Sequence, residues 1–250
     1  ALHRVTLFAG VPLMYNHMTQ LQEAADLSSL RLAISGGSPL PRAIHTLFYE
    51  RFGVSISEGY GLSEASPVTC FNPPGAEKIG TVGTRIPNVE LMIIDEGLNV
   101  LVPKRIGELV VRGPNVMTGY YKNEQATADA FANGYLRTGD LAMIDEDGYV
   151  TIIDRKKDLI LVGGYNVYPK EVEEVLYTYP GVQEVAVVGK MGQSMEEEVV
   201  AYVVSAQPLD EVKLQAYCAQ KLVRYKCPRH IIQRETLPKN STGKILKYKL

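Results

Sequence analysis

The chain has 250 residues, of which 46% are hydrophobic and 22% are charged, and its formal net charge is -2. This is the composition of an ordinary globular protein with enough chain for one large or two modest cores, and the charge excludes binding of nucleic acids by bulk attraction. Three widely spaced cysteines predict reduced thiols in a cytoplasmic protein, and no apolar run approaches bilayer length, so we expect no transmembrane segment and leave peripheral membrane contact open.

The first part of the chain alternates strand-like and helix-like patterns. They cover residues 5–12, 16–25, 30–37, 38–52 and 53–61. In the helix expected at 38–52, Ser38 is the predicted N-cap and Pro41 suits the first turn. Ile44, Leu47 and Phe48 share its apolar face. Strands alternating with helices predict the end of a parallel α/β sheet.

The middle part is rich in β runs punctuated by turn residues. The runs cover residues 89–103, 107–114 and 141–155. The dipeptide Asp147-Gly148 lies between two such arms, which is a strong hairpin signal. We therefore predict a small antiparallel sheet or barrel from about Gly80 to Ile153.

The last part predicts a compact α+β domain. Residues 168–180 form an amphipathic pattern in which Val172, Val175, Leu176 and Tyr179 face inward. Two strands, at 182–190 and 196–205, and a second helix, at 209–222, complete the expected unit. The fold class predicted for the whole chain is thus mixed α/β and α+β.

A run of charged residues, 154–158, is the natural boundary of this last domain. We predict three parts: residues 1–79 as the C-terminal part of a large α/β domain, 80–155 as a β-rich subdomain and 156–250 as a mobile C-terminal domain. From Arg224 to Leu250 the chain carries eight Lys and Arg residues against Glu235 alone. Such a tail can attract a phosphorylated ligand, although for any single lysine a solvated surface is the better explanation.

The stretch EGYGLSE, residues 58–64, combines groups that suit a nucleotide. Its glycines allow close backbone approach, and Tyr60 offers a flat face for a purine. Ser63 can donate to a phosphate, and Glu64 is an oxygen ligand suited to Mg²⁺ beside a polyphosphate. A plain glycine-rich turn with an exposed carboxylate is the structural alternative.

Three further loops carry candidate chemistry. SGGSP, residues 35–39, is a close-approach loop or a tight helix entry, and no Walker A sequence occurs in the chain. In RTGD, Asp140 follows a glycine turn and can hold ribose hydroxyls, although TGD is also common in turns. In STGK, Lys244 is a mobile positive charge suited to phosphoryl or nucleotidyl transfer.

Seven motifs occur in order along the chain: SGGSP (35–39), GYGLSE (59–64), GEL (107–109), TGD (138–140), DRKKD (154–158), GGYN (163–166) and PK…GK (238–244). Together they resemble the adenylate-forming acyl-CoA synthetases over essentially the whole chain. The resemblance implies activation of a carboxylate by ATP to an acyl-adenylate and pyrophosphate, followed by acyl transfer to the thiol of coenzyme A.

The same resemblance implies which residues bind the nucleotide. The glycine-rich contacts are Gly36, Gly37, Ser38, Gly59, Tyr60, Gly61, Leu62 and Ser63. Gly36, Gly37 and Ser38 would border the adenine and the acyl carboxylate. Tyr60 would lie against the adenine, and Ser63 would touch phosphate.

Charged residues complete the implied site. Glu64 would bind Mg²⁺ and serve catalysis. Asp140 would hold the ribose hydroxyls with the help of Arg155. Lys244 would bridge the attacking carboxylate and the α-phosphate, stabilising the negative charge gathered there.

The resemblance also implies a large rotation of the C-terminal domain between the two half-reactions. Lys157 matches the hinge position. The rotation would withdraw the Lys244 loop and bring Gly163, Gly164 and Tyr165 to the acyl-adenylate, where the glycines leave room for the pantetheine arm of coenzyme A.

Departures from the family pattern refine the prediction. The Ser/Thr/Gly-rich phosphate loop is absent, so we interpret the chain as the C-terminal half of a synthetase, inactive in adenylation without its N-terminal half. Leu161 stands where luciferase-like members carry a second lysine, which disfavours light emission, and GGYN disfavours a peptide-synthetase domain. A non-catalytic binding fragment stays an alternative, and an unrelated ATP hydrolase is disfavoured by the missing Walker lysine.

The acyl substrate is predicted only by class. Val11, Gly36, Tyr60, Pro67 and Val68 are expected near the acyl tunnel, and their small or apolar character fits a fatty or an aryl acid. We favour medium or long fatty acids over aryl acids such as cinnamates. The sequence does not define the oligomeric state.

Overall fold

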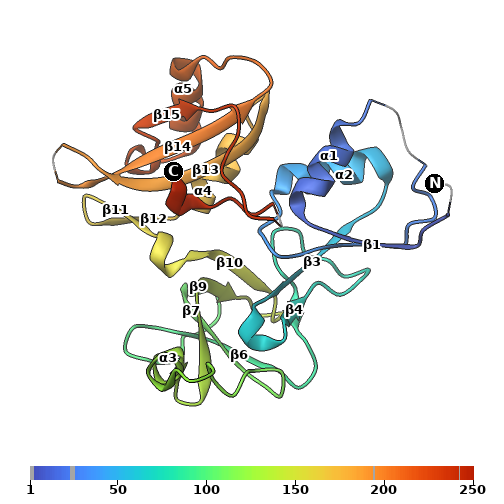
Figure 1. Cartoon of the computed structure of the whole chain (residues 1–250). Coiled ribbons are helices and arrows are strands. Elements are labelled where there is room, and N and C mark those ends of the chain that lie inside the picture. The colour runs from blue at the N-terminus through green and yellow to red at the C-terminus, as the bar shows by residue number, and fades with distance from the viewer. Residues whose placement is uncertain (1–2, 23–25, 194, 242) are drawn as a thin grey trace. The chain divides into compact units, whose positions relative to one another are not determined.

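The computed structural model describes residues 3–22, 26–193, 195–241 and 243–250. The chain divides into two compact units, Ala1–Ile153 and Asp154–Leu250 (Figure 1). Both combine helices with sheets, and the mixed α/β fold class predicted from the sequence is confirmed.

A mixed five-stranded sheet forms the first layer of the N-terminal unit. Its strands lie in the order β1 (Leu7–Gly10), β2 (Leu32–Ser35), β3 (Ile56–Gly61), β4 (Val68–Phe71) and β5 (Thr84–Arg85). The first three pair in parallel, and the last two continue the sheet antiparallel. The parallel strands are linked by α1 (Pro12–Gln20) and α2 (Arg42–Phe52), as the alternating pattern predicted (Figure 1).

The two helices pack on each other and on this sheet through aromatic side chains. Tyr15 and Phe48 are fully buried, and their rings meet edge to face with centroids 5.1 Å apart. Ala33 and Ile56 of the strands join the same cluster. This packing fixes the strand ends from which the site loops emerge.

Several details of these helices differ from the sequence-based expectation. The first helix begins at Pro12, not Asn16, and ends at Gln20; residues 23–25 of the expected helix lie outside the described residues. Pro41, not Ser38, precedes α2, and no side chain caps it. Leu47 is half exposed and His45 is buried, because the face of the helix that packs on the sheet is shifted toward His45.

The β-rich part forms an antiparallel sheet in the order β10-β9-β7-β6. The strands are β6 (Glu90–Ile94), β7 (Gly107–Arg112), β9 (Tyr135–Ile144) and β10 (Val150–Arg155), and β8 (Phe131–Ala132) pairs with β9. The predicted hairpin turn is confirmed: Gly148 has a φ of 84° and donates its N–H to the carbonyl of Asp145 at 3.1 Å. The helix α3 (Glu124–Ala130) was not expected, since it buries no residue and has no apolar stripe.

The C-terminal unit is built on a sheet in the order β13 (Val182–Met191), β14 (Glu197–Ser205) and β15 (His230–Gln233). Helices α4 (Pro169–Tyr177) and α5 (Glu211–Lys221) contribute Val172, Leu176 and Leu214 to its core, which are fully buried. The strand β15 and the small hairpin of β11 (Ile160–Val162) and β12 (Tyr165–Val167) were missed because each is only three or four residues long.

None of the helices within the described ranges is both long and apolar enough to cross a bilayer.

Candidate functional site

The carboxyl ends of the parallel strands gather several predicted site residues of the N-terminal unit. Ser35, the last residue of β2, pairs with Glu58 of β3, so SGGSP and EGYG leave neighbouring strands. A Cβ at Gly36 would lie 3.8 Å from the carbonyl oxygen of Gly59. Ligands of open α/β sheets bind at this edge. The two glycine-rich motifs thus border one place.

Tyr60 and Asp140 meet in the same unit although 80 residues separate them. The Tyr60 hydroxyl donates to Oδ2 of Asp140 at 2.5 Å. Burial, followed by the Asp140 carboxylate beside it, raises the pKa of the Tyr60 phenol well above its usual range. The phenol therefore stays protonated and keeps donating at neutral pH.

The backbone holds Asp140 in turn. Its N–H donates to Oγ1 of Thr138 at 3.1 Å, and the Thr138 hydroxyl donates to the Leu109 carbonyl at 2.8 Å. The Asp140 residue is only 9% exposed. The supporting role of Thr138 was not foreseen, although it belongs to the TGD motif.

Gly61 starts a tight turn that no larger residue can form. A Cβ there would lie 1.7 Å from the carbonyl oxygen of Pro67. The same carbonyl accepts the N–H of Leu62 at 2.8 Å. Ser63 opens the short 3₁₀ helix η1 (Ser63–Ala65) and is exposed, so its hydroxyl is accessible to a ligand.

Asn115 closes this turn from the β-rich part. Its amide donates to the carbonyls of Ala65, at 2.8 Å, and Val68, at 3.0 Å. No sequence signal marked this residue, because the turn it supports lies about 50 positions earlier in the chain.

Glu64 lies half exposed at the end of the turn. Its Oε1 accepts the hydroxyl of Tyr120 at 2.9 Å, and this hydrogen bond raises the pKa of Tyr120. Among the described residues no group of three or more His, Cys, Asp and Glu side chains could hold a metal. A single carboxylate fits Mg²⁺, which keeps several waters and takes its remaining ligands from phosphates.

The residues expected near an acyl group lie at the same strand ends. Val11 follows β1 and precedes α1, and it is half-buried. Pro67 is exposed, and Val68, the first residue of β4, is 39% exposed. Each is available to an apolar ligand.

Lys244 lies on a hairpin of the C-terminal unit. Its N–H donates to Oδ1 of Asn240 at 2.9 Å, and its carbonyl accepts the Asn240 N–H at 3.0 Å. Gly243, with a φ of 82°, makes the turn possible. Lys239 and Ile245 form a β-bridge across the hairpin.

A second turn of this unit carries the predicted glycine pair. Gly163 and Gly164 have φ angles of 54° and 82° and connect β11 to β12. A Cβ at either would meet no atom within 4 Å among the described residues, so the space beside them is open. Tyr165 is 60% exposed and stacks on Tyr225 with centroids 4.8 Å apart.

The charged run at the start of this unit is only partly exposed. Arg155 and Lys157 are exposed, and Lys157 lies in the 3₁₀ helix η2 (Lys156–Asp158). Asp154 is buried and accepts the N–H of Lys170, in the first turn of α4, at 2.7 Å. Leu161, on β11, is 52% exposed.

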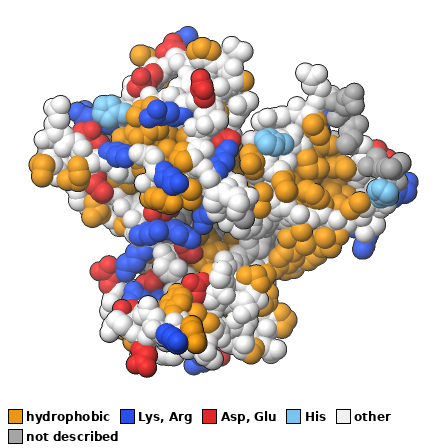
Figure 2. Space-filling view, in the orientation of Figure 1, with side chains coloured by type: hydrophobic (Ala, Val, Ile, Leu, Met, Phe, Trp, Pro, Cys, Tyr) orange, Lys and Arg blue, Asp and Glu red, His pale blue; other side chains and the backbone are white. Residues whose placement is uncertain are grey.

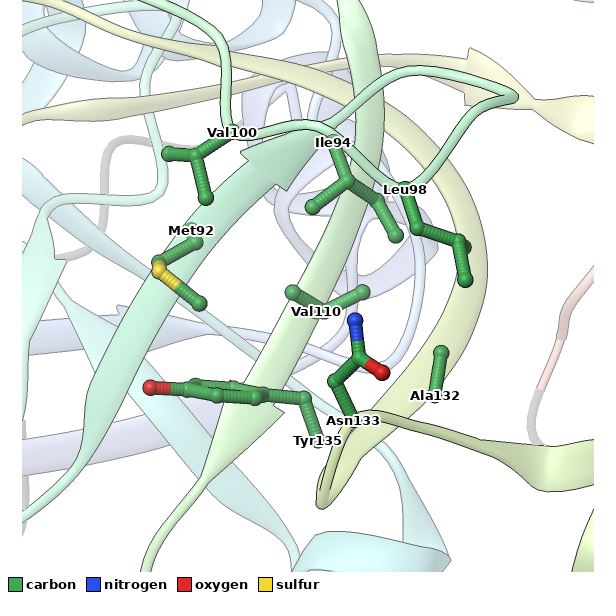
Figure 3. A pocket seen from close by; sticks show the side chains of 8 residues that line it. All are labelled: Met92, Ile94, Leu98, Val100, Val110, Ala132, Asn133 and Tyr135. Atoms are coloured by element: carbon green, nitrogen blue, oxygen red, sulfur yellow. The ribbon is translucent and has the colours of Figure 1, made fainter.

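A shallow pocket elsewhere in the β-rich part contains none of the predicted site residues (Figure 3). Its wall includes the side chains of Met92, Ile94, Leu98, Val100, Asn133 and Tyr135. The apolar lining of this pocket offers no charged group for a phosphate or a metal.

Comparisons with known proteins place the chain in a family. Residues 1–121 match the family described as AMP-binding enzyme, and residues 171–244 match the AMP-binding enzyme C-terminal domain. A long-chain-fatty-acid–CoA ligase of Escherichia coli O157:H7 is 41% identical over 249 residues, which is 98% of this chain and 44% of that protein.

Solved structures agree. ATP-bound MatB from Rhodopseudomonas palustris matches 99% of this chain and 50% of its own with a TM-score of 0.94 at 35% identity. The anthranilate CoA ligase AuaEII in complex with anthranoyl-AMP matches 99% of this chain and 49% of its own with a TM-score of 0.92 at 33% identity. The chain spans about half the length of the curated relatives that it matches. By sequence and fold, the chain belongs to the family of AMP-binding, adenylate-forming enzymes.

Proposed function

We propose that the full-length protein is a cytoplasmic acyl-CoA synthetase that activates a fatty acid with ATP and transfers the acyl group to coenzyme A. The names of the fatty-acid ligase and of the ATP-bound and acyl-AMP-bound structures support this reaction. The hydrogen bond between Tyr60 and Asp140, beside two glycine turns, carries the proposal, because it joins a flat apolar ring to a carboxylate as adenosine recognition requires.

In the first step, a carboxylate oxygen of the acid attacks the α-phosphorus of ATP. The bond from that phosphorus to the bridging oxygen breaks, and pyrophosphate leaves. Tyr60 supplies the face for adenine, and Asp140 accepts the ribose hydroxyls, assisted by Arg155. Gly36, Gly37 and Ser38 border the adenine and the acyl carboxylate, where backbone N–H groups can approach closely.

Charge at the phosphates is met by three side chains. Ser63 donates to a phosphate oxygen. Glu64 would hold Mg²⁺, which would supply charge neutralisation at the phosphates. Lys244 carries its ammonium to the carboxylate and the α-phosphate, where negative charge gathers in the transition state.

In the second step, the thiol sulfur of coenzyme A attacks the acyl carbonyl, the thiol proton is lost, and the carbon–oxygen bond to AMP breaks. The open space beside Gly163 and Gly164 accommodates the slender pantetheine arm, with Tyr165 at its side. Between the two steps the C-terminal domain rotates about Lys157, which withdraws the Lys244 hairpin and brings the turn of Gly163 and Gly164 to the acyl-adenylate.

The acyl chain is proposed to be fatty. Val11, Pro67 and Val68 present apolar surface at the strand ends, and the relative from Escherichia coli is named for long-chain fatty acids. The name of the anthranilate CoA ligase supports an aryl acid as the alternative substrate. Side-by-side assays with a long-chain fatty acid and a cinnamate decide between them.

We propose that an N-terminal half precedes this chain in the full-length protein and covers part of its surface. Large apolar side chains are exposed on the α/β part, where Figure 2 shows hydrophobic groups gathered around α1 and α2. Leu7, Met14, Leu47 and Tyr49 are each 50% exposed or more. Exposed apolar patches of this kind mark interaction surfaces.

The 250-residue chain alone is expected to be almost inactive in adenylation, because the Ser/Thr/Gly-rich phosphate loop is not among its residues. Pyrophosphate exchange is measured for the full-length protein and for this chain, with acyl-CoA formation followed by mass spectrometry. Fatty-acid-dependent exchange by the full-length protein supports the proposal. Absence of exchange with every carboxylic acid tested, or equal exchange by the 250-residue chain, contradicts the corresponding part of it.

A further inference from the structure

Two ion pairs hold the Lys244 hairpin, one on each side of the lysine. Before it, Nζ of Lys239 lies 2.5 Å from Oε1 of Glu184, on β13. After it, Nζ of Lys247 lies 2.7 Å from Oε1 of Glu173, on α4. The four side chains are 16–25% exposed, so these pairs are screened less than surface pairs.

Each carboxylate is tied into the rigid part of the unit. Oε1 of Glu173 also accepts the N–H of Val187, on β13, at 2.8 Å. Oε2 of Glu184 is buried and finds no hydrogen-bond partner among the described residues, which leaves Lys239 to balance its charge. Through these carboxylates, the hairpin is held at a defined place relative to β13 and α4.

The register of the hairpin places Lys244, which is half-buried, and Ile245 on opposite faces. Lys239 and Ile245 are bridge partners, and Ile245 packs against the apolar cluster that contains Leu237. Adjacent residues of an extended strand point to opposite faces. Lys244 therefore projects from the face opposite Ile245.

Apolar contacts alone do not fix where along the sheet the hairpin lies. Leu237 is 4% exposed and packs on Val200 and Tyr202. Such contacts are non-directional. The two ion pairs add direction, since each joins one atom of the hairpin segment to one atom of the framework.

We propose that Glu173 and Glu184 are positioning residues that set where the ammonium of Lys244 lies during adenylation. This inference rests on the proposed function, in which Lys244 acts in the first half-reaction only. A misplacement of about 1 Å can cost a catalytic group as much as 100-fold in rate. Loss of either pair therefore slows adenylation and spares acyl transfer from a supplied acyl-adenylate.

The test uses Glu173→Gln and Glu184→Gln in the full-length protein, because glutamine keeps the size and removes the charge. Each variant is expected to lower kcat of adenylation by about 10-fold. Acyl transfer from supplied acyl-AMP to coenzyme A stays within about 2-fold of wild type. Retained transfer activity also shows that the variants fold.

Two comparisons distinguish a positioning role from a general loss of structure or activity. Lys247→Arg keeps the positive charge opposite Glu173 and is expected to retain adenylation activity. Lys247→Met removes this charge and is expected to lower adenylation activity. Glu198, on β14 of the same sheet, pairs with Arg229 at 3.2 Å and lies 3.5 Å from His230, outside the hairpin. Glu198→Gln removes this charge and is expected to change neither half-reaction.

Lys244→Ala distinguishes failure of this inference from failure of the proposed function. If Lys244→Ala adenylates at the normal rate, the role of Lys244 is wrong and the inference falls with it. If Lys244→Ala is slow while both glutamine variants match wild type, the positioning role alone is wrong. Equal slowing of both half-reactions by the glutamine variants also overturns it, because a positioning role predicts a selective effect.

Discussion

The two units present their candidate site residues by different physical means. In the N-terminal unit, Tyr60 bonds to Asp140, and Gly61 makes a turn by close backbone packing. In the C-terminal unit, ion pairs of Lys239 and Lys247 hold the hairpin of Lys244. The first arrangement is fixed by sterics and partly buried hydrogen bonds, and the second depends on charge. This difference suits the roles proposed above, in which the first arrangement binds the nucleotide and the Lys244 hairpin acts in one half-reaction only.

Removing the ammonium is expected to have the largest effect on function. Lys244→Ala in the full-length protein should lower kcat of adenylation by about 100- to 1,000-fold, because one donor to developing charge contributes that much. Acyl transfer from supplied acyl-AMP should stay near wild type. Pyrophosphate exchange and acyl-CoA formation measure the two steps.

The matched control is Lys249→Ala, a lysine of the same basic tail that lies exposed in the 3₁₀ helix η4 (Lys247–Lys249). It should leave both half-reactions within about 2-fold, since an exposed charge far along the segment adds little. Equal losses for the two lysine variants would mean that tail charge in general, and not Lys244, serves adenylation.

A substitution at Gly61 best tests whether close backbone packing fixes the turn of the N-terminal unit. Gly61→Ala places a Cβ 1.7 Å from the Pro67 carbonyl and should lower the free energy of unfolding by about 2–4 kcal/mol. Gly134→Ala is the control: its φ is 79°, but open space surrounds it, and the expected cost is about 1 kcal/mol. Urea unfolding followed by circular dichroism compares them, and equal costs would show that the turn relaxes around the added methyl group.

Removing one hydroxyl should affect nucleotide binding more modestly. Tyr60→Phe keeps the ring and removes one hydroxyl that donates to Asp140, so KM for ATP should rise about 5- to 10-fold with kcat within about 2-fold. Tyr149→Phe, which removes a hydroxyl bonded to the Ala76 carbonyl at 2.7 Å, should change neither constant. Steady-state kinetics over a range of ATP concentrations test this, and an unchanged KM for Tyr60→Phe would show that the hydrogen bond from Tyr60 to Asp140 does not contribute to nucleotide binding.

These comparisons also show how far the sequence could predict the molecule. Apolar periodicity predicted β2, β3, α4 and β14, because each buries a regular stripe or run. It missed α3, which buries nothing, and β15, a short strand within a basic segment. Short or fully exposed elements are set by their neighbours and leave no periodic signal of their own.

In the candidate site, too, residues within local motifs could be predicted from the sequence, but contacts between distant residues could not. Tyr60, Glu64 and Asp140 were predicted one by one from local motifs, but their partners were not. The contact of Tyr60 with Asp140 spans 80 positions, and that of Tyr120 with Glu64 spans 56. Such pairs depend on how strands from separate parts of the chain pack, which no local pattern encodes.

The smallest expected effect, that of salt on amide hydrogen exchange, tests most directly whether charge holds the Lys244 hairpin but not the N-terminal sheet. Raising NaCl from about 0.05 to 1 M in the full-length protein should speed amide hydrogen exchange of Lys244 and Leu246 by about 2- to 5-fold, because salt weakens partly exposed ion pairs. Amides of β2 and β3, held by strand pairing, should not respond. The double variant with Glu173→Gln and Glu184→Gln should exchange fast at both salt concentrations. A salt effect that persists in this variant would assign the sensitivity to other charges, and uniform acceleration in both units would remove the distinction between a platform fixed by sterics and a hairpin held by charge.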